Sequence, residues 1–146
     1  MQRVLVTAGA SGIGYALAEA FYAEGYKVWI IDVSENDLKK CPKNWKQTKL
    51  DVSDENAMGD LFSTINNEWG GLDVLCANAG TAGATELIED QDLLAFRKCL
   101  DVNLIGAFFI CKRLFADDEK ARQRSNYIYV IDCGALWVSL PFSLFG

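Results

Sequence analysis

Residues 4–14, with the sequence V-L-V-T-A-G-A-S-G-I-G, determine the fold that we expect for this chain. The aliphatic run at residues 4–6 is typical of a short strand that is buried on both faces of a parallel sheet. A glycine-rich turn follows, and then Ile13, Leu17 and Phe21 recur at every fourth position, which predicts a helix with an apolar stripe facing the sheet. We therefore predict a strand, a tight turn and a helix in direct succession.

Three glycines in this turn, Gly9, Gly12 and Gly14, favour a binding function for it. Without a Cβ atom they allow a sharp turn, a close approach of the helix to the strand, and access of a ligand to the first helical amides. Those amides have no partner within the helix and lie at the positive end of its dipole, so a pyrophosphate is the expected ligand. A purely structural turn remains the alternative for these residues taken alone.

An acidic residue follows the second apolar run of the chain. The run at residues 28–31 ends in Asp32, about 20 residues after the glycines. A carboxylate at this strand end can accept hydrogen bonds from a ribose diol, and it would repel the extra phosphate of NADP, so we expect NAD. The alternative is a solvated aspartate that opens a loop, with Ser34 or Asp37 capping the next helix.

Composition limits the classes of protein that this chain can represent. Its 146 residues, 51% of them hydrophobic, suffice for one domain with a core and are too few for a separate catalytic domain. The net charge of −6 argues against a nucleic-acid surface, and the absence of histidine removes the commonest general base and metal ligand, so no metal is expected.

Cysteine usage and the start of the chain predict a cytoplasmic location. The five cysteines form no Cys-x-x-Cys pair, lie mostly in apolar runs and are expected to be reduced, buried thiols: Cys41, Cys76, Cys99, Cys111 and Cys133. The first strand begins within a few residues of Met1, which leaves no room for a signal peptide. No apolar run is long enough to span a bilayer, so no membrane partner is expected.

Strand and helix patterns alternate along the rest of the chain. The expected elements are a polar helix at 35–40, a weak strand at 46–50, a helix that begins at Ser53 or Asp54, a strand at 72–77, a polar loop at 81–90 and a helix at 92–114. Five apolar residues define the buried face of the third helix: Met58, Leu61, Phe62, Ile65 and Trp69. This alternation predicts an α/β fold, a doubly wound parallel sheet with helices on both faces.

Five segments together resemble the short-chain dehydrogenase/reductase family in order and spacing. They are T-A-G-A-S-G-I-G at 7–14, Asp32, Asp51-Val52, Asn78-Ala79-Gly80 and Asn103 in D-V-N-L. The resemblance covers residues 2 to about 114. Ala8 stands where the family usually has its first glycine, and Ala77 stands where an asparagine is common.

The resemblance implies a Rossmann fold and a role for each of these residues. It assigns the NAD pyrophosphate to Thr7, Gly9, Ser11, Gly12, Ile13 and Gly14, the adenosine ribose to Asp32, the adenine to Asp51 and Val52, the nicotinamide side to Asn78, Ala79 and Gly80, and a place in the catalytic tetrad to Asn103. The implied reaction is hydride transfer between nicotinamide and a small alcohol or carbonyl compound. Taken singly, Asp51 could be a helix cap, Asn78 a turn residue and Asn103 a buried amide satisfied by backbone.

The catalytic half of the family pattern is missing from these 146 residues. The family pairs a serine on the fifth strand with a tyrosine and with a lysine four residues after that tyrosine, which lowers the pKa of the phenol. None of the five tyrosines has a lysine at that position, and the last lysine is Lys120. We therefore expect an inactive, truncated chain, or a non-catalytic NAD-binding fragment. A methyltransferase is a more distant alternative, in which an acidic residue would normally precede the glycines, where Thr7 stands.

Residues 115–146 form an atypical tail. The segment L-W-V-S-L-P-F-S-L-F-G at 136–146 has large apolar groups without periodicity. When each codon is taken from its second base, the codon of Trp137 must give glycine, and those of Val130 and Ile131 can give two serines. The codon of Leu144 can then give tyrosine, 13 residues after Ile131 (144 − 131), which matches the family's spacing. We therefore hypothesise a frameshift near residues 112–116.

An incomplete parallel sheet has consequences for the state of the chain in solution. Loss of the last strands and helices uncovers one side of a sheet that normally needs both faces covered. We expect a marginally stable or aggregating product, with a homo-oligomer contact through the helix around Asn103, where members of the family usually dimerise.

Overall fold

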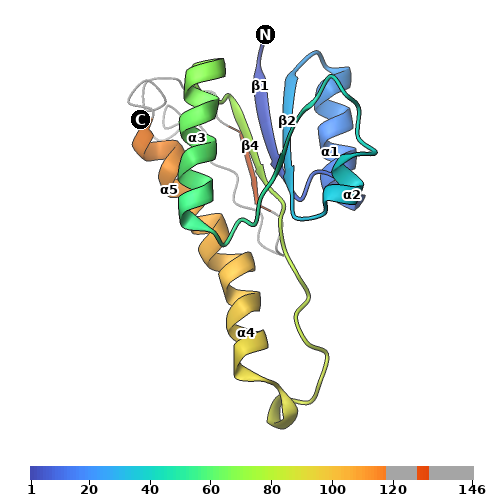
Figure 1. Ribbon diagram of the computed structural model, residues 1–146, viewed down its shortest axis with the longest axis vertical. Helices are drawn as coiled ribbons and strands as arrows, with labels where there is room; N and C mark the ends of the chain where they lie inside the picture. The colour runs from blue at the N-terminus through green and yellow to red at the C-terminus, as the bar shows by residue number, and fades with distance from the viewer. Residues whose placement is uncertain (118–127, 132–146) are drawn as a thin grey trace, which may run out of the picture.

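The computed structural model of the chain describes residues 1–117 and 128–131, and its centre is a five-stranded parallel sheet (Figure 1). The strands are β1 (Arg3–Thr7), β2 (Lys27–Asp32), β3 (Lys46–Lys49), β4 (Val74–Ala77) and β5 (Ile128–Ile131). Their order across the sheet is β3-β2-β1-β4-β5, and every neighbouring pair is parallel. This arrangement confirms the predicted α/β fold with a doubly wound sheet.

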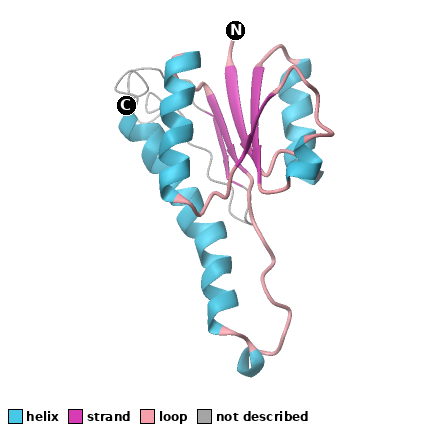
Figure 2. Cartoon of the chain, viewed as in Figure 1, coloured by secondary structure: helices cyan, strands magenta, loops and turns pink. Residues whose placement is uncertain are grey.

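Helices cover both faces of the sheet, as Figure 2 shows. They are α1 (Gly12–Ala23), α2 (Glu35–Leu38), α3 (Glu55–Trp69), the 3-10 turn η1 (Ile88–Asp90), α4 (Leu93–Leu100), the π-helix η2 (Asp101–Gly106) and α5 (Ala107–Asp117). One apolar cluster includes Leu5, Phe62 and Ile110 and lies between the sheet and α3 with α5. The other includes Val6, Ala18 and Trp45 and lies on the side of α1.

The order of the strands places a crevice between β1 and β4. The chain builds β1, β2 and β3 outward in one direction and then returns, through α3, to place β4 on the other side of β1. The loops after β1 and β4 therefore diverge at the carboxyl ends of these strands. In open α/β sheets, ligands bind at this point of reversal.

Helix α1 packs on the sheet through two small residues together with part of the apolar stripe that its sequence predicts, because Leu17 and Phe21 are partly buried against the core. Gly14 and Ala18 are its buried positions, whereas the side chain of Ile13 is 64% exposed. The prediction that Ile13 faces the sheet is therefore wrong. Gly14 and Ala18 face the sheet, and Ile13 at the first turn of the helix lies outside that contact.

Helix α3 matches its prediction closely. Asp54 caps its start by accepting a hydrogen bond from the amide of Ala57 at 3.0 Å, and Gly70 ends it with a φ of 71°. Four of the five predicted apolar residues are buried, and Trp69 is partly buried, with its ring 5.0 Å from that of Trp29. The residues that line this face of the core could thus be identified from spacing alone.

The helix expected at residues 92–114 is interrupted by the π-helical segment η2. A π turn contains an extra residue, which changes the face that the following residues present. Consequently Phe96 and Leu100 are 48% and 40% exposed, while Ile110 and Leu114 are buried. Phe96 and Leu100 of α4 therefore lie outside the core that Ile110 and Leu114 join.

The four cysteines that the structure describes are free thiols. Cys41 and Cys76 are buried, as predicted, and burial raises the pKa of the Cys76 thiol to about 12. Cys99 and Cys111 are only partly buried. Cys133 and the 136–146 segment lie outside the described residues.

Candidate coenzyme site

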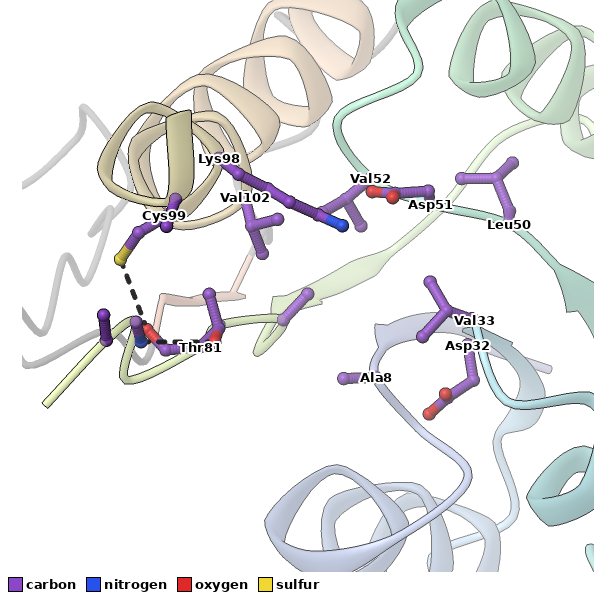
Figure 3. Close-up of a pocket in the computed structure, with 15 residues that line it drawn as sticks. Ala8, Asp32, Val33, Leu50, Asp51, Val52, Thr81, Lys98, Cys99 and Val102 are labelled. Atoms are coloured by element: carbon purple, nitrogen blue, oxygen red, sulfur yellow. Dashed lines mark hydrogen bonds between the residues drawn. The ribbon is translucent and has the colours of Figure 1, made fainter. Parts of the chain in front are cut away.

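Two adjoining cavities open at the carboxyl ends of β1, β2 and β4. The first has a volume of about 480 Å³, and its wall includes Asp32, Asp51 and Lys98 (Figure 3). The second has a volume of about 440 Å³, and Ser11, Ile13, Asn78 and Asn103 line it. Three residues line both cavities: Ala8, Gly80 and Thr81. A long ligand can therefore occupy both cavities at once.

The glycine turn brings the start of α1 against the end of β1. A Cβ atom on Gly14 would lie 2.0 Å from the carbonyl oxygen of Ala8, and one on Gly9 would lie 2.7 Å from Cγ2 of Ile30. Gly12 has a φ of 53° and nothing within 4 Å of the position of a Cβ atom. The side chain of Ser11 at the N-cap makes no capping hydrogen bond. The open space and the uncapped amides fit a pyrophosphate.

Ala8 adopts a backbone conformation that favours glycine. Its φ is 49°, and among the described residues other than glycine it is the one with a positive φ. A Cβ atom in this region costs about 1–2 kcal/mol. The family resemblance places a glycine at this position, so the turn geometry is kept at the expense of strain.

Asp32 ends β2 with its carboxylate held by backbone. The side chain is only 9% exposed. Its Oδ2 accepts a hydrogen bond from the amide of Ala10 at 3.2 Å, and its Oδ1 accepts one from the amide of Ser34 at 2.9 Å. Ser34 also caps α2 by accepting from the amide of Asp37. The capping part of the alternative interpretation is thus correct, but Asp32 is not a solvated loop residue. Each carboxylate oxygen has a second acceptor site.

Asp51 and Val52 lie on the opposite wall of the first cavity. Oδ1 of Asp51 accepts from the backbone amide of Ser53 at 3.0 Å and from its hydroxyl at 2.7 Å. These two hydrogen bonds, with a smaller contribution from the charge of Lys98, hold the pKa of Asp51 below its usual value. Asp51 therefore remains an acceptor at neutral pH. Val52 is buried beside Gly106, where a Cβ atom would lie 2.9 Å from Cγ2 of Val52.

Thr7 and Asn78 tie the end of β1 to the loop after β4. The hydroxyl of Thr7 accepts from the amide of Ala79 at 2.8 Å, and Nδ2 of Asn78 donates to the carbonyl of Thr7 at 3.1 Å. Thr7 is fully buried, whereas Asn78 lines the second cavity. The side chain of Thr7 thus positions the two loops from below the crevice.

Asn103 lies in the π-helical segment and pairs with the backbone of Thr81. Its Oδ1 accepts from the amide of Thr81 at 2.7 Å, and its Nδ2 donates to the carbonyl of the same residue at 2.8 Å. Nδ2 also lies 3.4 Å from the sulfur of Cys99. The amide is therefore satisfied by backbone, and it fixes the loop after β4 against the helix while facing the second cavity.

Reasoning from the sequence missed several cavity-lining residues, among them Val33, Thr81, Lys98 and Cys99. Lys98 and Cys99 precede Asn103 by slightly more than one helical turn, so helical spacing from Asn103 could have identified them. Val33 directly follows Asp32 at the mouth of the first cavity and is 61% exposed. An exposed valine next to a strand end carries no comparable signal.

The described part of the chain provides neither a candidate metal site nor a membrane-spanning helix. Within residues 1–117 and 128–131, no three or more Cys, Asp or Glu side chains group in a way that could hold a metal ion. Over the same ranges, no helix combines the length and the apolar character needed to cross a bilayer.

Known proteins similar to this chain share its fold and part of its sequence. The family model described as short chain dehydrogenase matches residues 2–130. The chain is 35% identical to (+)-borneol dehydrogenase 1 of Salvia officinalis over 113 residues, which are 74% of this chain and 44% of that protein. It is 31% identical to L-fucose dehydrogenase of Oryctolagus cuniculus over 130 residues, which are 87% of this chain and 45% of that protein.

A solved structure shows the same relation. The crystal structure of a 3-ketoacyl-ACP reductase from Sinorhizobium meliloti 1021 superposes with a TM-score of 0.77 at 27% identity, covering 88% of this chain and 52% of that one. The chain thus spans about half the length of the proteins that it matches. The match of the family model over most of the sequence, together with the fold, shows that this chain belongs to the short chain dehydrogenase family.

Proposed function

We propose that this chain binds NAD across the two cavities and forms the coenzyme-binding half of an oxidoreductase that acts on small alcohols or carbonyl compounds. The family uses NAD or NADP, and the bound nicotinamide would supply the hydride acceptor or donor. In the proposed complex the turn at residues 8–14, which Thr7 supports from beneath, contacts the pyrophosphate, Asp32 the adenosine ribose, and Asp51 with Val52 the adenine. The segment at residues 78–80 and Asn103 would then face the nicotinamide end.

The carboxylate of Asp32 is the observation that carries the preference for NAD. It is nearly buried, and its two backbone hydrogen bonds fix it at the edge of the first cavity. A ribose 2′-hydroxyl can donate to such a carboxylate, whereas a 2′-phosphate would place like charges together at a cost of several kcal/mol.

We expect NAD to bind at least tenfold more tightly than NADP, and Asp32→Asn to reduce this ratio to about twofold. The amide keeps one acceptor oxygen but removes the charge. Dissociation constants of NAD and NADP from titration calorimetry would provide the ratio for each protein. The matched control is Asp60→Asn, which removes the same charge from an exposed position on α3. An unchanged preference in Asp32→Asn would contradict the role given to this carboxylate.

A second candidate function is NAD binding without catalysis. It is favoured by the tyrosines, none of which is followed by a lysine at the fourth position. We expect no formation of NADH from NAD with any of a panel of alcohols and sugars, under conditions where the chain is saturated with NAD. Turnover with one of these substrates that persists after repurification would exclude this candidate.

The frameshift hypothesis for the tail stays separate from both candidates, because it concerns the gene. It predicts that the nucleotide sequence from the codon of Lys112 onward contains, in a shifted frame, a tyrosine at the codon of Leu144 and a lysine four codons later. A source gene without that lysine codon would rule it out.

A further inference from the structure

Lys98 is the one basic residue among the described residues that line the two cavities. It extends from α4 along the wall of the first cavity, and Figure 3 shows its ammonium group directed toward Asp51 and Val52. Val33, Asp32 and Ala8 lie on the other side of the same cavity (Figure 3). Lys98 therefore reaches the end of the cavity that contains Asp51, away from the glycine turn.

Lys98 lies in a cavity whose other charged lining groups, in the part of the chain that the structure describes, are two carboxylates. Asp32 and Asp51 are the only acidic groups among the described residues that line the first cavity. The charge of Lys98 also contributes, after the hydrogen bonds from Ser53, to the lowered pKa of Asp51. The cavity end therefore presents a fixed acceptor, the Asp51 carboxylate, beside a cationic donor on a flexible stem.

This pair complements the edge of adenine. Adenine presents an exocyclic amino donor beside a ring nitrogen acceptor. A carboxylate accepts from the first and an ammonium group donates to the second. Apolar side chains of the same cavity, Val33, Val52 and Val102, provide surfaces suited to an aromatic ring.

We propose that Lys98 is a coenzyme-binding residue whose ammonium group donates a hydrogen bond to a ring nitrogen of adenine. The neighbouring amino group of the base donates its own hydrogen bond to the carboxylate of Asp51. The inference rests on the proposed binding of NAD and adds a contact to its adenine end. It predicts that Lys98 acts on the uncharged base and not through attraction to the phosphates.

The test uses two ligands that separate the base from the phosphates. Adenosine carries no phosphate, whereas ADP-ribose carries the pyrophosphate as well. Dissociation constants for both would be measured by ligand-observed NMR titration for the full chain, Lys98→Met, Lys98→Arg and Arg97→Met. Arg97→Met is the matched control, because it removes one positive charge from the neighbouring position on α4 without lining either cavity.

We expect Lys98→Met to weaken the binding of adenosine and of ADP-ribose by the same factor, about fivefold, because one partly solvated charged hydrogen bond is lost. Lys98→Arg should stay within about twofold of the unsubstituted chain, and Arg97→Met should not differ from it. A loss confined to ADP-ribose, or no loss at all, would overturn the role of Lys98 while leaving the coenzyme site intact. Failure of the unsubstituted chain to bind either ligand would overturn the proposed function itself.

Discussion

Replacing Gly14 with alanine is expected to destabilise the folded chain by about 3 kcal/mol and to remove binding of NAD. The new Cβ atom would lie 2.0 Å from the carbonyl oxygen of Ala8 and 2.7 Å from Nδ2 of Asn78. The nearest of these atoms is backbone, so no flexible side chain can move aside. Helix α1 would have to shift away from the end of β1, and the turn that we assign to the pyrophosphate would lose its shape.

Two other glycines provide matched controls for this prediction. Gly12 and Gly25 have φ values of 53° and 84°, and a Cβ atom on either one would meet nothing within 4 Å. Alanine at each should cost about 1 kcal/mol from backbone strain alone. Of these two controls, only Gly12→Ala should also weaken the binding of NAD, because Gly25 follows the C-terminal end of α1, far from the glycine turn.

Urea unfolding of the three variants would distinguish the cost of backbone strain, at Gly12 and Gly25, from the added cost of the steric clash at Gly14. NAD titration of the same variants would show which positions contact the ligand. If Gly14→Ala costs no more stability than Gly25→Ala, the close approach of α1 to β1 does not determine the fold of the turn. If Gly12→Ala binds NAD as tightly as the unsubstituted chain, the pyrophosphate does not occupy the space beside Gly12.

The elements of this fold could be predicted because their signals are local. A buried aliphatic run, a glycine turn and an apolar spacing of three and four residues identify β1, the turn and α3 without knowledge of their neighbours. The position of Asp32 at a strand end likewise follows from the boundary between the run at residues 28–31 and the polar residues after it.

What the sequence did not reveal depends on contacts between distant segments. Ile13 is exposed because α1 presents Gly14 and Ala18 to the sheet, a choice of face that depends on the packing of the helix against β1. The π segment around Asn103 coincides with the pairing of that side chain with Thr81, 22 positions earlier in the chain. Spacing from Asn103 points to Lys98, but its proximity to Asp51 in the first cavity depends on how α4 packs over the segment after β3. Periodicity describes which face of a helix is apolar, but not where an interruption changes that face.

The exposed apolar side chains of α4, η2 and α5 are expected to make this chain self-associate at micromolar concentration. The set, here called the α4–α5 face, comprises Leu93, Leu94, Phe96, Leu100, Leu104, Ile105 and Phe108, each between 38% and 70% exposed. Large exposed apolar patches mark contact surfaces or aggregation sites. We propose a second copy of the chain as the partner, because two such helical faces can bury each other symmetrically.

The double variant Leu104→Glu and Phe108→Glu should shift the chain from dimer to monomer in sedimentation velocity. Its urea unfolding midpoint should be nearly unchanged when both proteins are measured at a concentration where they are monomeric. Both side chains are about 60% exposed (61% and 59%), so they contribute little to the core of the monomer. Two charges introduced into an apolar contact remain unpaired there and cost several kcal/mol of association energy. Ser63→Glu with Asn67→Glu adds the same charge on the exposed side of α3 and should leave association unchanged. A chain that sediments as a monomer without these substitutions would show that the α4–α5 face is tolerated in water, and the expected dimer contact would then be wrong.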